Sequence, residues 1–155
     1  MSIEKVRAYF KDLGIDDQIL ELDTSTATVP LAAKALGVEE GRIAKTLAFL
    51  VDDKPIVIVM AGDVKIANAK FKAFFHQKAK MLTPEEASTL IGHSVGGVCP
   101  FAVNDGVKVY LDDSLKKYDH LYPACGSSNS AIRLTLKELE KYSNATAWVD
   151  VSKEQ

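Results

Sequence analysis

Cysteine, net charge and long apolar runs are all scarce in this 155-residue sequence, and each scarcity excludes a class of protein. The two cysteines, Cys99 and Cys125, form neither a zinc-ligand spacing nor a Cys-x-x-Cys redox motif. No apolar run approaches the roughly 20 residues of a membrane-spanning helix. We therefore expect no metal site, no membrane partner and two reduced thiols that mainly pack. A contact with a bound ligand is the alternative for the thiols.

Length and composition indicate one globular domain that spans residues 1–155. Hydrophobic residues make up 47% of the chain and charged residues 26%, as in an ordinary soluble protein. A chain of this length buries roughly two-thirds of the surface that it exposes when unfolded. Residues 1–7 contain no apolar h-region, so the sequence predicts no secretory signal and a cytoplasmic location.

Positive charge is concentrated in one segment, although the net charge is only −2. Residues 64–80 contain no acidic residue and carry Lys65, Lys70, Lys72, Lys78 and Lys80. A local lysine patch of this kind attracts phosphate groups even on a slightly acidic protein. The alternative is a solvated helix face that binds nothing.

Helical periodicity and capping signals predict the helices. Thr83-Pro84-Glu85-Glu86 and Thr135-Leu136-Lys137-Glu138 are capping boxes, which mark helix starts. Thr28-Val29-Pro30 opens another helix, and Gly37 ends it. The expected helices are residues 2–13, 28–37, a short turn around 39–41, 64–75 with Asp63 as its cap, 84–90 and 136–143.

Short apolar runs bounded by turn residues predict the strands. Residues 45–51 and 55–61 flank Asp52-Asp53-Lys54, a pattern typical of a hairpin of two buried strands. Further strands are expected at residues 18–22, 107–111, 121–124, 130–134 and 146–151. Because strands and helices do not alternate regularly, their order favours an α+β domain over a doubly wound sheet.

Lys45 is a lone cation at the start of an otherwise apolar strand, where a charge needs a partner or a function. Further along, residues 92–101 form a glycine-rich turn that contains Gly96, Gly97 and Pro100. Glycine has no Cβ, so such a loop can bring backbone N–H groups close to a ligand. Together these features suggest a site for a small anionic or carbonyl-bearing group. The alternatives are a lysine that extends to solvent and a plain tight turn.

The Lys45-Thr46-Leu47 strand start, the Gly96-Gly97-Val98-Cys99-Pro100 loop and residues 124–134 resemble the YbaK/EbsC family. That family contains free-standing aminoacyl-tRNA deacylases and the editing domain of bacterial prolyl-tRNA synthetases, and the resemblance covers nearly the whole chain. It implies a curved mixed sheet that closes into a barrel-like core with helices packed outside. It also implies trans-acting hydrolysis of the ester of mischarged tRNA, without a cofactor. Because no His/Cys/Asp/Glu set in the sequence has metal-ligand spacing, we expect this hydrolysis to be metal-independent. The expected substrate is tRNA for proline that carries Cys, Ala, Ser or Thr.

The resemblance, read with the residue pattern, gives individual residues expected roles. Lys45 is the expected catalytic residue, and Lys65, Lys70 and Lys72 are expected to bind tRNA. Substrate binding is expected from His93, Gly96, Gly97, Val98, Cys99, Pro100, Gly126, Ser127 and Ser128. The expected partners are aminoacyl-tRNA and a synthetase such as prolyl-tRNA synthetase.

Several questions remain open at the level of sequence. No Ser-His-Asp arrangement is present, so the attacking group is a positioned water or the side chain of the substrate itself. Ala102, Ser128, Asn129 and Ala131 depart from the pattern of better-known members, which leaves the edited amino acid open. The alternative function is a non-catalytic module of the same fold that binds a nucleotide or a tRNA end, followed by a small-molecule esterase or an unrelated regulatory domain.

Overall fold

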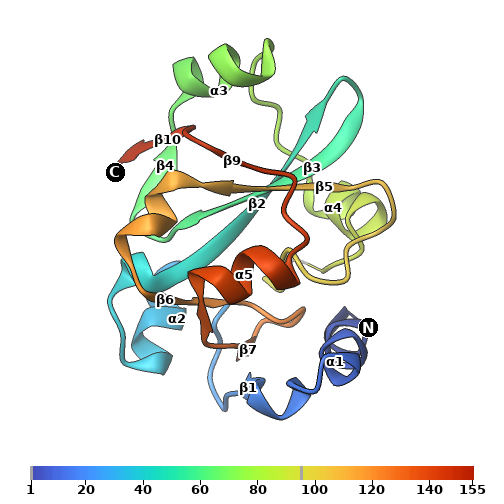
Figure 1. Cartoon of the computed structure of the whole chain (residues 1–155), viewed down its shortest axis with the longest axis vertical. Helices are drawn as coiled ribbons and strands as arrows, with labels where there is room; N and C mark the ends of the chain where they lie inside the picture. Colours follow the sequence, from blue (N-terminus) through green and yellow to red (C-terminus); the bar gives the residue numbers. More distant parts are fainter. Residues whose placement is uncertain (1, 95) are drawn as a thin grey trace.

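A curled, six-stranded mixed sheet forms the centre of the molecule in a computed structural model that describes residues 2–94 and 96–155 (Figure 1). The strand order is β8-β6-β2-β3-β5-β9. The strands are β2 (Ile43–Val51), β3 (Lys54–Ala61), β5 (Lys108–Asp112), β6 (His120–Pro123), β8 (Leu134–Thr135) and β9 (Ala147–Val149). The expected α+β class and the curved, half-barrel sheet are confirmed.

The hairpin of β2 and β3 is the centre of this sheet, as the sequence predicted. The two strands pair antiparallel from Ala44 opposite Ala61 to Val51 opposite Lys54. Asp52 and Asp53 form the turn with φ angles of 52° and 62°, which suits the right-handed twist of a two-residue hairpin loop. Residues 56–61 are all buried, because both faces of β3 are covered.

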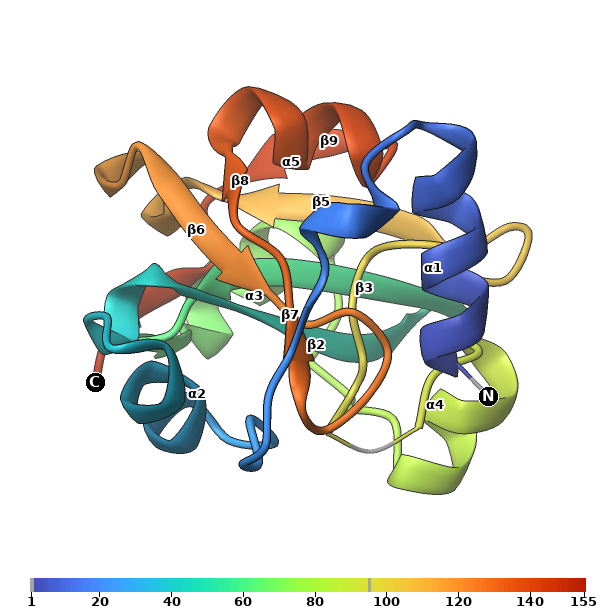
Figure 2. The same cartoon turned by 90° about the horizontal axis from the view of Figure 1, so that it is seen from below.

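Helices cover the two faces of β3 (Figure 2). Val57 and Val59 pack in a core with side chains from α1, α4 and α5, whereas Ile58 and Met60 point to the other face and pack with α3. The helices are α1 (Ser2–Asp12), α2 (Val29–Leu36), α3 (Asn68–Phe75), α4 (Pro84–Leu90) and α5 (Leu136–Tyr142). Figure 1 shows α3 at the opposite end of the molecule from α1.

Both predicted capping boxes are present. Thr83 accepts a hydrogen bond from the Glu86 N–H and its own N–H donates to the Glu86 carboxylate, and Thr135 and Glu138 do the same at α5. Thr28 caps α2, and Gly37 ends it with a φ of 69°. Short 3₁₀ turns lie at Asp16–Gln18, Glu40–Arg42 and Asp113–Lys117.

The predicted helix at residues 64–75 is wrong in its first part. Val64–Ile66 forms a strand, β4, that pairs antiparallel with β10 (Ser152–Glu154), and α3 begins only after Ala67. Asp63 therefore caps no helix. A pairing partner near the far end of the chain overrides the local helical pattern, and β10 itself carried no sequence signal that we recognised.

The single strand expected at residues 130–134 is divided in two. β7 (Ser130–Ala131) pairs with β1 (Leu20–Glu21), and β8 pairs with β6. The final strand, expected at 146–151, is limited to Ala147–Val149. No helix in residues 2–94 and 96–155 has both the length and the apolar character needed to cross a membrane.

Asp112 fixes the C-terminal segment to the central sheet. Its carboxylate is fully buried and accepts hydrogen bonds from the Val151 N–H (2.9 Å), the Ser152 hydroxyl (2.6 Å) and the Ser114 N–H (2.9 Å). These three hydrogen bonds satisfy the buried carboxylate oxygens, as burial of a carboxylate requires.

Candidate active site

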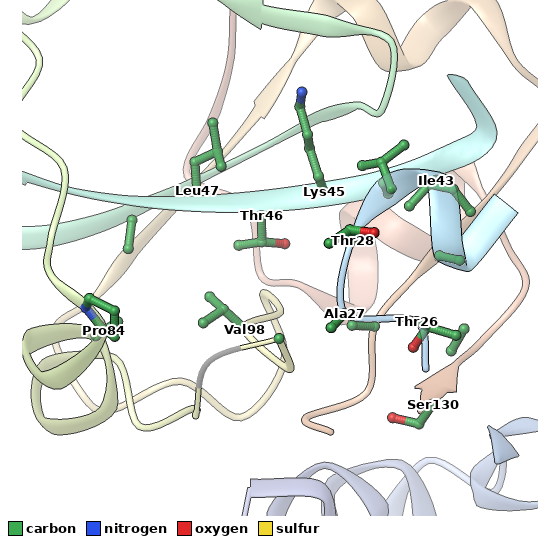
Figure 3. A pocket seen from close by; sticks show the side chains of 18 of the residues that line it. Thr26, Ala27, Thr28, Ile43, Lys45, Thr46, Leu47, Pro84, Val98 and Ser130 are labelled. Atoms are coloured by element: carbon green, nitrogen blue, oxygen red, sulfur yellow. The ribbon is translucent and has the colours of Figure 1, made fainter. Parts of the chain in front are cut away.

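A cavity opens where one edge of β2 lacks a neighbouring strand. On that edge β6 pairs only with Ile43 and Ala44, and a bridge to Met81 is formed at Phe49. Between these pairings, residues 45–47 border a cavity of about 370 Å³, without another strand partner in the described part of the chain. Its walls also include residues 26–29, residues 81–84 and the glycine-rich loop (Figure 3).

The glycine-rich loop and the segment that begins at Gly126 are in direct backbone contact. A Cβ at Gly97 would lie 2.5 Å from the carbonyl carbon of Gly126. A Cβ at Gly96 would lie 3.1 Å from that of Ala27 and 3.2 Å from that of Ser128, and Gly96 has a φ of +81°. The glycines thus allow three separate segments to meet at one end of the cavity.

The structure separates the predicted substrate-binding residues into two groups. Gly96 and Val98 line the cavity itself. The others stand behind its wall: His93, Gly97, Cys99, Pro100, Gly126, Ser127 and Ser128. Residue 95 of the loop lies outside the described residues.

His93 and Cys99 form a buried pair behind the loop. His93 Nε2 lies 2.7 Å from the carbonyl oxygen of Phe101 and 3.6 Å from Cys99 Sγ. Burial lowers the pKa of His93 and raises the pKa of Cys99 to about 12. Burial also raises the pKa of Cys125 well above its usual value. At neutral pH these groups are therefore uncharged, and neither thiol is an activated nucleophile.

The segment after Cys125 is held by its own hydrogen bonds. The Ser127 hydroxyl bonds to the Asn129 side-chain oxygen (2.9 Å) and to the Ser130 hydroxyl (2.7 Å). The Gly126 carbonyl accepts a hydrogen bond from the Ser2 hydroxyl at the start of α1. Ser130 lines the cavity, so this network supports part of the wall.

Lys45 lines the cavity, but its ammonium group points away from the glycine-rich loop. Lys45 Nζ donates to the carbonyl oxygens of Gly62 (3.4 Å) and Val64. Figure 3 shows the side chains of Lys45 and Thr46 on opposite sides of β2, with Thr46 toward Val98. Burial lowers the pKa of Lys45, and the nearby Asp63 carboxylate opposes that shift.

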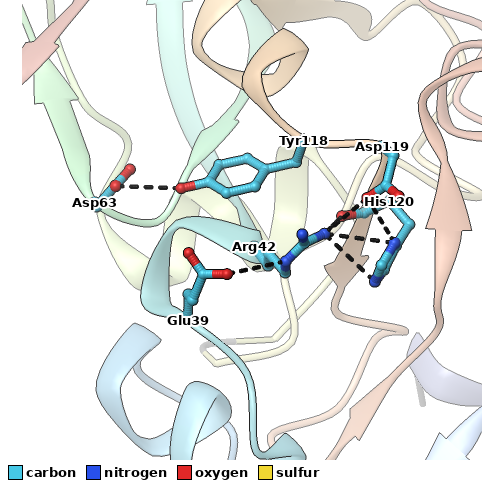
Figure 4. Close-up of polar contacts among 6 residues, drawn as sticks. All are labelled: Glu39, Arg42, Asp63, Tyr118, Asp119 and His120. Carbon is cyan, nitrogen blue, oxygen red and sulfur yellow. Dashed lines mark hydrogen bonds and ion pairs between the residues drawn. The ribbon is translucent and has the colours of Figure 1, made fainter.

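A network that the sequence analysis did not identify surrounds Asp63 (Figure 4). The Tyr118 hydroxyl donates to Asp63 Oδ2 at 3.4 Å. This approach requires Gly41, because a Cβ there would lie 1.8 Å from the Tyr118 hydroxyl oxygen. The Arg42 guanidinium, 5.2 Å from the centre of the Tyr118 ring, donates to the Asp119 carboxylate at 2.9 Å. This hydrogen bond lowers the pKa of Asp119.

Sequence reasoning also missed Thr26, Thr46, Met81 and Tyr122, which line the cavity. The orientation of Thr46 is predictable from the sequence, because side chains alternate along a strand and the residue after Lys45 faces the other side. The remaining three approach the cavity through tertiary packing, for which the sequence carries no local signal.

The three lysines expected to bind tRNA lie outside the cavity. Lys65 is in β4, and Lys70 and Lys72 are in α3. Lys70 Nζ donates to the Asp150 carboxylate (3.0 Å) and the Ser152 carbonyl (2.9 Å), so it has partners within the protein. Within residues 2–94 and 96–155, no group of three or more His, Cys, Asp or Glu side chains is arranged to hold a metal ion.

The fold is a curled α+β sheet with a cavity between a lysine-bearing strand and a glycine-rich loop. These features define a class of domain that holds a small group at the edge of a sheet. The chain belongs to the aminoacyl-tRNA editing domain family, whose sequence model matches residues 23–142. The expected relation to YbaK-type proteins and to the editing domain of prolyl-tRNA synthetases is confirmed.

Similar proteins include free-standing chains and parts of synthetases. The uncharacterized protein YwhH of Bacillus subtilis (strain 168) is 47% identical over 155 residues, which cover 99% of both chains. A proline–tRNA ligase of Lactiplantibacillus plantarum is 29% identical over 96% of this chain, which spans only 25% of that ligase. A solved structure described as a proposed trans-editing enzyme for prolyl-tRNA synthetase has a TM-score of 0.87 and 29% identity, with 98% of this chain and 97% of that chain covered.

Proposed function

We propose that this protein is a trans-acting deacylase that hydrolyses the ester of mischarged aminoacyl-tRNA. Its proposed substrate is tRNA for proline that carries a small amino acid such as Cys, Ala, Ser or Thr, and a prolyl-tRNA synthetase is the proposed partner. The family and the free-standing relatives support this proposal. The observation that carries it is the cavity of about 370 Å³, which is lined by Lys45 and by Gly96 and Val98 of the glycine-rich loop.

The loop is the proposed holder of the ester carbonyl. The Gly97 N–H donates to the Ser94 carbonyl (3.1 Å) and so maintains the turn. Gly96 and Val98 line the cavity, and we assign the ligand-facing role to their N–H groups. Backbone donors fixed in this way stabilise the negative charge that grows on a carbonyl oxygen during ester hydrolysis.

Lys45 is the proposed source of positive charge. Its ammonium lies across β2 from the loop, which favours a contact with ribose or phosphate at the cavity mouth over a contact with the carbonyl oxygen. Either role needs a charged lysine. The Asp63 carboxylate, which raises the pKa of Lys45, favours that charged state.

The attacking group in this proposal is water or the side chain of the substrate. The thiols of Cys99 and Cys125 are buried and protonated, and His93 is buried behind the wall. When water attacks, its oxygen bonds to the ester carbon, the bond from that carbon to the ribose oxygen breaks, and the ribose oxygen takes up a proton. We propose that no metal ion takes part.

A non-catalytic module that binds the aminoacyl end of tRNA is the second candidate. One observation favours it: the Lys45 ammonium is already occupied by the carbonyl groups of Gly62 and Val64. A panel of charged tRNAs separates the two functions. Loss of the aminoacyl group from tRNA for proline, unaffected by EDTA, is expected of the deacylase. Binding of the panel without any hydrolysis would establish the module instead.

A further inference from the structure

Two buried hydroxyl groups on the cavity wall have no hydrogen-bond partner. Among the described residues, the buried side-chain oxygen and nitrogen atoms without a partner are Thr26 Oγ1, Thr46 Oγ1 and His93 Nδ1. Thr26 and Thr46 both line the cavity, whereas His93 does not. Figure 3 shows the Thr46 side chain directed from β2 toward the loop side of the cavity.

The other threonine and serine hydroxyls of the cavity wall each have a hydrogen-bond partner. Thr28 accepts from the Leu31 N–H at 3.3 Å, and Thr83 accepts from the Glu86 N–H at 3.1 Å. Ser130 shares a hydrogen bond with the Ser127 hydroxyl at 2.7 Å. Leaving a buried hydroxyl unpaired destabilises a folded protein, so a pair of them in one cavity indicates a ligand that supplies the missing partners.

The chemistry of the wall limits what that ligand group can be. Much of the cavity wall is apolar and built from small residues, among them Ala27, Ala44, Ala48, Val98, Ala124 and Ala131. No carboxylate is among the described residues that line the cavity. A hydroxyl donates one hydrogen bond and accepts up to two, so an unpaired threonine hydroxyl in an apolar wall suits a neutral hydroxyl, which can act as donor or acceptor.

We propose that Thr46 is a specificity-determining residue that hydrogen-bonds a hydroxyl on the side chain of the aminoacyl group. Thr26, which lies beside Ser130 on a separate part of the wall (Figure 3), is assigned to another polar group of the same ligand. The inference rests on the proposed function of the same cavity. It means that the cavity prefers a seryl or threonyl group over the apolar alanyl or valyl group of similar shape. One neutral hydrogen bond distinguishes such pairs by about tenfold.

The test compares Thr46→Val and Thr26→Val with the wild type on tRNA for proline charged with serine, threonine, alanine or valine. The wild type is expected to hydrolyse the seryl and threonyl esters about tenfold faster than the alanyl and valyl esters, measured as kcat/KM. Thr46→Val should lose about tenfold on the hydroxyl-bearing esters and stay within about twofold on the others, whereas Thr26→Val should slow all four esters alike. Thr46→Ser should restore the preference, and Thr89→Val, at an exposed threonine of α4 outside the cavity, should leave it unchanged.

Stability gives a second readout, because valine replaces an unpaired hydroxyl with a methyl group of the same shape. Thr46→Val should therefore unfold at the same or a higher temperature than the wild type, while its preference is lost. Equal losses of Thr46→Val on all four esters, or a preference that survives this variant, would overturn the assignment.

Binding separates this inference from the proposed hydrolysis. Non-hydrolysable amide analogues, seryl and alanyl 3′-amino-3′-deoxyadenosine, can be titrated by calorimetry. If no ester is hydrolysed but the seryl analogue binds about tenfold more tightly and Thr46→Val removes that difference, the specificity assignment stands without the deacylase. Equal affinity of the wild type for both analogues overturns it.

Discussion

Gly97→Ala tests whether the glycine-rich loop maintains the cavity or only makes a turn. A Cβ at this position would lie 2.5 Å from the Gly126 carbonyl carbon and 2.6 Å from the Ser127 nitrogen. Both are backbone atoms, so no side-chain rotation relieves the overlap and the two loops must separate. Overpacking of this kind costs about 1–3 kcal/mol. For a domain of this size, each kcal/mol lowers Tm by about 2–4 °C.

The same displacement should reach the cavity, because Gly96 and Val98 on either side of Gly97 line it. A shift of about 1 Å in a positioning group costs about 10²-fold in rate. Thermal unfolding and deacylation are measured together. Gly106→Ala is the control, since Gly106 has a φ of +88°, no atom within 4 Å of an added Cβ and no place in the cavity wall. It should lose stability through backbone strain and keep the wild-type rate. A Gly97→Ala protein with unchanged Tm and rate would refute the reasoning.

Four further outcomes follow from the contacts of individual side chains. Lys45→Ala should lower kcat/KM for deacylation by about 10²-fold while the protein still unfolds cooperatively. An unchanged kcat/KM would show that Lys45 takes no part in the reaction. Burial lowers the pKa of Lys45, and Asp63 opposes that shift. The ammonium is lost as pH rises through this pKa, so Asp63→Asn should move the alkaline fall in kcat/KM to lower pH; a profile that stays in place contradicts this role. Asp112→Ala leaves buried donors unpaired and should cost about 1–3 kcal/mol in urea unfolding; a smaller change would mean that water replaces the carboxylate. Changing Lys65 and Lys72 together to glutamate should weaken tRNA binding and flatten its salt dependence. Hydrolysis of an aminoacyl-adenosine ester should stay unchanged. Equal tRNA affinity of this variant and the wild type at physiological salt would show that the lysine patch is only a solvated surface.

The parts of the fold that the sequence predicted are those encoded by neighbouring residues. The two capping boxes, the Asp52-Asp53 hairpin turn and the continuous apolar run of β3 are each encoded within a few positions. The parts that it missed depend on distant segments. Val64–Ile66 pairs with β10 near the end of the chain, and local helical spacing contains no information about that partner.

The site shows the same division. The glycine-rich loop was recognisable as a candidate because its glycines are adjacent in sequence, and the structure gives them a close backbone contact with residues 126–128. The residues that complete the cavity, such as Thr26 and Tyr122, come from a loop and a strand that meet β2 only in the folded chain. No spacing rule identifies them. The Tyr118–Asp63 contact likewise depends on Gly41. A Cβ added at Gly41 would lie 1.8 Å from the tyrosine oxygen, a relation that only the folded structure shows.

Alternation along β2 separates the chemical groups that lie next to each other in the Lys45-Thr46-Leu47 motif. Lys45 and Leu47 point to one side of the strand and Thr46 to the other (Figure 3). The Lys45 ammonium therefore donates to the Gly62 carbonyl and interacts with the Asp63 carboxylate. The neutral Thr46 hydroxyl faces the cavity beside the loop. A strand whose edge is unpaired at this point exposes both sides to one ligand, which a fully paired strand could not do. We infer that this gap in the sheet lets a charged end and a neutral end of one substrate be held by consecutive residues.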